Sequence, residues 1–139
     1  MKRILLVEDH DSDVAQIKSA FERFSLDVQL EHVRTTELAW GLMQCWVDAP
    51  GARRPACLLL GQLPGPRDGL WLLQRMQDDR RFRRLPVIAV SRDAAMSDRA
   101  RVFPNVVGAL ERPVDDLAWR RVISAVARIS QALPDLAGA

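Results

Sequence analysis

The sequence predicts an α/β fold built on a doubly wound parallel sheet. Short runs rich in Ile, Val and Leu alternate along the chain with segments whose apolar residues recur every three or four positions. Such uninterrupted apolar runs are typical of strands that are covered by helices on both faces. The chain has 139 residues, of which 48% are hydrophobic, so we expect one domain with a substantial core.

Five strands are expected, over residues 3–7, 28–33, 56–60, 86–90 and 106–111. Each strand is followed by a helical pattern. We expect each of the first three helices to bury one apolar face. The inward-facing residues are Val14, Ile17, Phe21 and Phe24 in the first helix, Leu38, Leu42 and Cys45 in the second, and Leu70, Leu73 and Met76 in the third. A short fourth helix is predicted over 94–101. The last, over about 114–133, begins near Pro113 and buries Ala118, Val122, Val126, Ile129 and Leu133.

Composition excludes several classes of protein. A net charge of only +2 gives no case for a nucleic-acid partner. No apolar run approaches the roughly 20 residues of a membrane span, and no signal peptide is evident, so we expect a soluble, cytoplasmic protein. Cys45 and Cys57 lie in apolar segments and are expected to be buried free thiols rather than a disulfide or a metal site.

The carboxyl ends of the predicted strands carry the polar residues of interest. In open parallel sheets the ligand site lies outside these ends. Glu8 and Asp9 end the first strand, Leu60 and Gly61 the third, Ser91 the fourth and Arg112 the fifth. The topology alone therefore predicts that these residues converge.

Four segments in this order resemble the response-regulator receiver domains. They are "ILLVEDHDSD", "LPGPRDGLWLL", "LPVIAVS" and "ERPVDDL", and the resemblance covers residues 2–129. It implies a flavodoxin-like sheet with the strand order 2-1-3-4-5. We expect residues 1–139 to form a single receiver-like domain with a mobile tail after residue 133.

The resemblance also implies roles for individual residues. In the family, two acids after the first strand and one Asp after the third hold Mg²⁺, and that Asp accepts the phosphoryl group. Glu8 and Asp9 match the two metal acids, and Ser91 matches the switch hydroxyl. Arg112 stands at the position of the family's lysine, and Ala109 at that of its switch aromatic residue.

The acceptor acid is missing from this sequence. Counting back from Leu63-Pro64 places the acceptor at Leu60, whereas counting back from Asp68-Gly69 places it at Gly61. Neither side chain can be phosphorylated or bind a metal. With only Glu8 and Asp9 as ligands we expect no cofactor, or at most weak Mg²⁺ binding, because Mg²⁺ prefers an octahedron of oxygens.

Other acids near these strand ends have ordinary interpretations. Asp11 and Asp13 lie at a helix start, where acids are favoured, and Asp68 is expected to cap the third helix. We expect Arg112 to reach across the strand ends and pair with Glu8 or Asp9. The arginine-rich segment "DDRRFRR" is expected to be a solvated loop.

The sequence therefore predicts an atypical, non-enzymatic receiver that acts by protein contact, independently of phosphorylation. The expected partner is a histidine kinase or another signalling protein, with a homodimer left open and with no membrane or nucleic-acid partner. Trp71 and Trp119 are the candidate partner-binding residues, since exposed aromatic side chains often anchor partners. Two alternatives stay open: a working phosphorelay receiver with a non-standard acceptor, and a small enzyme on the same fold.

Overall fold

The computed structural model describes residues 2–24, 28–48, 54–111 and 115–132. Five parallel strands form one sheet in the order β2-β1-β3-β4-β5, as predicted. The strands are β1 (Lys2–Val7), β2 (Val28–Val33), β3 (Cys57–Leu60), β4 (Val87–Ser91) and β5 (Val106–Glu111). The fold class predicted from the sequence is therefore confirmed.

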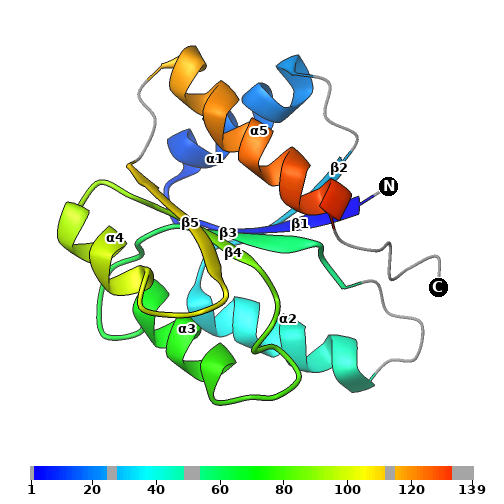
Figure 1. Ribbon diagram of the computed structural model, residues 1–139, viewed down its shortest axis with the longest axis vertical. Coiled ribbons are helices and arrows are strands. Elements are labelled where there is room, and N and C mark those ends of the chain that lie inside the picture. Colours follow the sequence, from blue (N-terminus) through cyan, green and yellow to red (C-terminus); the bar gives the residue numbers. More distant parts are fainter. Residues whose placement is uncertain (1, 25–27, 49–53, 112–114, 133–139) are drawn as a thin grey trace.

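Five helices cover the two faces of this sheet (Figure 1). They are α1 (Asp11–Arg23), α2 (Thr36–Asp48), α3 (Gly69–Gln77), α4 (Ala94–Ala100) and α5 (Asp116–Ala132). Helices α1 and α5 lie on one face, and α2, α3 and α4 lie on the other. None of these helices, within the described part of the chain, is long and apolar enough to cross a bilayer.

The central strands contribute side chains to both apolar layers. Along β1, Ile4 and Leu6 pack toward α1 and α5, whereas Leu5 and Val7 pack in the layer beneath α2 and α3. This alternation follows from the two-residue period of a strand. The register pairs Val7 with Leu60 and Leu60 with Ala89, so the strands end close together at one edge of the sheet.

Helix α2 turns a different face inward than the sequence pattern predicts. Leu38 is 57% exposed and Cys45 is also exposed, so the prediction that they lie inside is wrong. The buried residues are Thr36, Ala39, Met43 and Trp46, one stripe with helical spacing. The Thr36 hydroxyl donates to the carbonyl oxygen of Arg67 at 2.6 Å, which orients the first turn of the helix. Cys57 is buried as predicted, and burial raises the pKa of its thiol to about 12.

The arginine-rich segment after α3 is only partly a solvated loop. Its arginines are exposed, but Phe82 is 1% exposed and packs in the core. The Phe82 ring meets the Trp40 ring edge-on, with centroids 5.5 Å apart. One aromatic side chain therefore holds this loop to the layer beneath α2 and α3.

We predict that Phe82→Ala lowers the free energy of unfolding by about 3 to 5 kcal/mol, because it leaves a cavity in a closely packed layer. Urea denaturation with Arg83→Ala as the matched control would measure this, since Arg83 is an exposed neighbour. Equal effects of the two substitutions would show that the loop is not held by Phe82.

Candidate functional site

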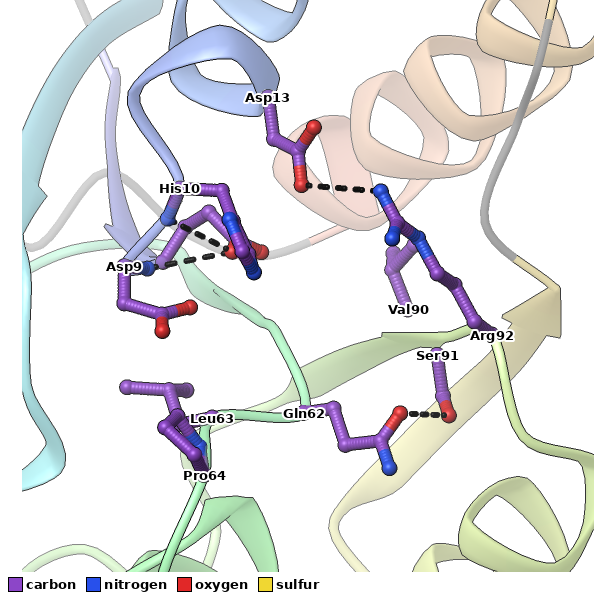
Figure 2. Close-up of a pocket in the computed structure, with 10 residues that line it drawn as sticks. Asp9, His10, Asp13, Gln62, Leu63, Pro64, Val90, Ser91 and Arg92 are labelled. Carbon is purple, nitrogen blue, oxygen red and sulfur yellow. Dashed lines mark hydrogen bonds and ion pairs between the residues drawn. The ribbon is translucent and has the colours of Figure 1, made fainter.

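The carboxyl ends of β1, β3 and β4 surround an open pocket of about 440 Å³ (Figure 2). The pocket is lined by three acids, one histidine, and polar and apolar residues from the two facing loops: Glu8, Asp9, His10, Asp13, Gln62, Leu63, Pro64, Val90, Ser91 and Arg92. The predicted convergence of Glu8, Asp9 and Ser91 is therefore present in the structure.

Glu8 is half-buried, and its carboxylate is turned toward the backbone that follows it. Its Oε1 atom accepts hydrogen bonds from the backbone N–H groups of Asp9, at 3.1 Å, and His10, at 3.2 Å. Burial raises the pKa of Glu8 above its ordinary value, and the neighbouring Asp9 raises it further, although the two N–H groups oppose this shift. Folding thus makes ionisation of Glu8 less favourable than it is in the unfolded chain.

Neither candidate acceptor position presents a carboxylate to the pocket. Leu60 is 1% exposed and packs in the apolar layer beneath α2 and α3. The Gly61 N–H donates to the carbonyl oxygen of Val7 at 2.9 Å. A Cβ atom on Gly61 would overlap Oε2 of Glu8, so the end of the flexible Glu8 side chain lies in the space that a side chain at 61 would take.

Ser91 is buried, with 2% of its surface exposed, and its hydroxyl is held in place. The hydroxyl lies 3.0 Å from Oε1 of Gln62 and 3.0 Å from the carbonyl oxygen of Asp93, and it accepts from the Asp93 N–H at 2.9 Å. Figure 2 shows the Gln62 side chain directed toward Ser91, with the amide oxygen facing the hydroxyl. Because a hydroxyl has one hydrogen, the two acceptor oxygens share one donor.

Asp13 and Arg92 belong to the site, although the sequence predicts Asp13 only as an acid at a helix start and assigns no role to Arg92. Asp13 is 4% exposed although it lies in the first turn of α1, and its Oδ2 atom is 3.7 Å from a guanidinium nitrogen of Arg92 (Figure 2). The only sequence signal was that Asp13 lies four residues before Ile17 on the buried face of the predicted helix. Its partner Arg92 is 79 positions away, and no local pattern links the two.

The side chains present do not fit a tightly bound Mg²⁺ ion. Among the described residues, no three His, Cys, Asp or Glu side chains are grouped so that they could hold a metal. One Glu8 oxygen already accepts two backbone hydrogen bonds, and the nearby Asp13 carboxylate faces Arg92. These contacts leave fewer carboxylate oxygens free for a Mg²⁺ ion, which would have to draw most of its ligands from water.

The loop between β3 and α3 contains two residues in the left-handed region. Leu63 has φ +53° and Gly65 has φ +85°, so the backbone reverses around Pro64. The loop ends at Asp68, whose carboxylate accepts from the Trp71 N–H at 3.0 Å. The predicted role of Asp68 as the cap of the third helix is thereby confirmed.

The two predicted partner-binding tryptophans lie in different surroundings. Trp119 is 4% exposed and packs between α1 and α5, so the prediction that it lies at the surface is wrong. It follows the helix period of Val122 and Val126, which places it inside the apolar stripe rather than beside it. Trp71 is half-buried, and the guanidinium groups of Arg67 and Arg75 lie 5.4 and 5.2 Å from its ring centroid.

Several predictions for the end of β5 and for the C-terminal tail concern residues outside the described ranges. They concern the bridge from Arg112 to Glu8 or Asp9, the helix start at Pro113 and the tail after residue 133. Ala109, at the position of the family's switch aromatic residue, is described: it is 6% exposed, and its carbonyl oxygen accepts from Arg101 at 2.7 Å. A small buried side chain therefore occupies that position.

The strand order, the acids at the end of β1 and the hydroxyl at the end of β4 match those of response-regulator receiver domains. Its function accordingly belongs to signalling. No protein-family model matches the chain. The assignment rests on the structure and on its likeness to known receivers.

Three known proteins illustrate this likeness. The "Probable methanogenesis regulatory protein FilR2" of Methanothrix harundinacea (strain 6Ac) is 26% identical over 124 residues, which are 88% of this chain and 79% of that protein. The structure of response regulator RPA3017, in red light signaling of R. palustris, is 26% identical with a TM-score of 0.76 and 91% of both chains covered. The Mn(2+)-bound form of response regulator Rcp1 has a TM-score of 0.78 at 19% identity, over 96% of this chain and 98% of that one, and it supports the fold alone.

The raised pKa of Glu8 predicts how the stability of the folded protein depends on pH. An acid whose pKa is higher in the folded state loses stability as the pH rises through its unfolded value, here 4.5, toward its folded value. We predict that Glu8→Gln has a higher melting temperature than the wild type at neutral pH, and that this difference disappears below pH 4.5.

Thermal denaturation over a pH series would measure the difference, with Glu22→Gln as the control because Glu22 is exposed on α1. A wild type that is more stable than Glu8→Gln at neutral pH would contradict the prediction. It would mean that the two N–H groups outweigh the cost of burial.

Proposed function

We propose that this receiver works without phosphorylation, as a non-enzymatic protein-interaction module in a two-component network. The observation that carries the proposal is the end of β3, where Leu60 packs into the core and the Glu8 carboxylate fills the space beside Gly61. A phosphoryl acceptor needs a carboxylate that is open to its donor. Neither position supplies one.

The Ser91 contacts support the same proposal. In a phosphorylated receiver the switch hydroxyl moves toward the phosphoryl oxygens. Here an oxygen of the Gln62 amide already lies within hydrogen-bond distance of the Ser91 hydroxyl. The Gln62 oxygen thus supplies an acceptor from within the chain, and the β4–α4 loop keeps one arrangement without a covalent modification.

The first alternative, a receiver with a non-standard acceptor, depends on the remaining acids of the pocket. Asp9 is the best placed of these, because it lines the pocket and is half-buried. Asp13 faces Arg92, and Asp68 caps α3, so both carboxylates are already engaged. The second alternative, a small enzyme, would need a base beside Ser91, whose contacts are instead an amide and backbone groups.

The proposed partner is a histidine kinase or another signalling protein, and Trp71 is the partner-binding residue proposed on α3. Tryptophan and arginine are enriched at the centres of protein interfaces. Trp71 lies between Arg67 and Arg75, and Arg67 is itself paired with Glu37 at 3.2 Å. The indole is therefore held in one orientation before any partner arrives.

We predict that incubation with acetyl phosphate and Mg²⁺ gives no phosphoryl adduct, because no carboxylate lies at positions 60 to 62. Intact-mass spectrometry would measure this, alongside a receiver that retains its acceptor Asp as the positive control. A stoichiometric adduct that is lost in Asp9→Asn, Asp11→Asn or Asp68→Asn would overturn the proposal in favour of the first alternative.

A second prediction concerns the contact between Gln62 and Ser91. In a double-mutant cycle of Gln62→Ala and Ser91→Ala, we expect a coupling free energy of about 0.5 to 1.5 kcal/mol, the usual net worth of a hydrogen bond. Urea denaturation of the four proteins would give this value. Additive effects of the two substitutions would show that Gln62 does not hold the Ser91 hydroxyl. The Ser91 contacts would then no longer support the proposal that this receiver works without phosphorylation.

A further inference from the structure

Helix α5 presents a basic stripe to solvent on the side opposite its buried face. The stripe consists of exposed residues at helical spacing, which also line a shallow hollow of about 350 Å³: Leu117, Arg120, Arg121, Ser124 and Arg128. The opposite face of the helix packs in the core through Trp119, Val122 and Val126. We call these five residues the α5 stripe.

The arginines of the α5 stripe belong to the arginines that have no ion pair among the described residues, as do Arg80, Arg83 and Arg84. Six arginines pair with a nearby acid: Arg3, Arg34, Arg67, Arg81, Arg92 and Arg101. Within the described part of the chain, Arg120, Arg121 and Arg128 have no such ion pair. The sequence explains this, since residues 117–132 contain no acidic residue.

One of these arginines is already held in position. The Arg120 guanidinium lies 5.5 Å from the centroid of the Phe24 ring, at the end of α1. A cation–π contact of this kind is not a hydrogen bond, so N–H donors of the guanidinium stay available for carboxylates. A side chain that is held before binding loses less conformational entropy when a partner arrives.

An exposed apolar residue lies at the start of the stripe. Leu117 is 62% exposed. The rise of 1.5 Å per residue places residues 117 and 128 about 17 Å apart, a length that about five residues of extended peptide would match. The stripe therefore offers one apolar contact followed by donors for carboxylates.

We propose that the α5 stripe binds a short acidic segment of a partner protein, with an apolar side chain on Leu117 and carboxylates on Arg121 and Arg128. Charge complementarity selects this occupant, because no acid of the described residues pairs with these three arginines. A nucleic acid would gain nothing from Leu117, and one exposed leucine is too small an apolar area to enter a bilayer. The proposal specifies the chemistry of a protein partner, so it rests on the proposed interaction function. It does not depend on the absence of a phosphoryl acceptor.

The test uses the whole chain and a fluorescein-labelled peptide, Glu-Leu-Asp-Glu-Leu-Glu-Asp, with its Gln and Asn counterpart as the uncharged control peptide. We expect saturable binding of the acidic peptide by fluorescence anisotropy, and weaker binding as salt is raised. The double variant Arg121→Gln/Arg128→Gln should weaken binding at least tenfold. The double variant Arg80→Gln/Arg84→Gln removes the same charge from exposed positions elsewhere and should leave binding unchanged.

Four results would overturn this proposal. They are the absence of saturable binding, equal losses in the two double variants, and tighter binding of duplex DNA or phosphatidylserine vesicles through the same arginines. The fourth is a dimer in sedimentation that only the α5 variant abolishes, since the occupant would then be a second copy of the chain. A phosphoryl adduct in the acetyl phosphate assay would refute the proposed function but would leave the peptide result standing, so the two proposals fail separately.

Discussion

The end of strand β3 is the constraint on which the whole site depends. Leu60 is paired in register with Val7 and packs into an apolar layer, so this position contributes no charge. Because Gly61 has no side chain, there is room for the Glu8 carboxylate in the space beside the end of β3. That position buries Glu8 enough to raise its pKa, and it turns one carboxylate oxygen toward the backbone instead of the pocket.

The architecture could be predicted from the sequence because it depends on short-range patterns. Apolar runs located the strands within one or two residues, and the resemblance supplied their order. The predicted inner face of helix α2 is wrong because the apolar residues of this helix form two overlapping stripes, and either stripe could face the core. The choice between Leu38 and Ala39 is made by a contact from Thr36 to the distant residue Arg67. The prediction for Trp119 is wrong because the spacing of the apolar residues in α5 is compatible with Trp119 either inside the buried stripe or beside it.

The site could be predicted only as far as the topology determines it. Strand ends converge, so Glu8, Asp9 and Ser91 were correctly expected to lie around one pocket. The contacts from Gln62 to Ser91 and from Arg92 to Asp13 join residues on different loops, and their side-chain directions depend on tertiary packing. Periodicity contains no information of that kind. The proposed α5 stripe is intermediate between these cases: its spacing and its lack of acids can be read from the sequence, but its exposure to solvent becomes evident only in three dimensions.

The left-handed residues on either side of Pro64 have a consequence for comparing this chain with other receivers. Residues 60 to 62 are tied to neighbouring strands through Gly61 and Gln62, whereas the backbone reverses at Leu63 and Gly65. Leu60 and Gly61 therefore both stay candidates for the position that holds aspartate in other receivers, because both lie before the reversal.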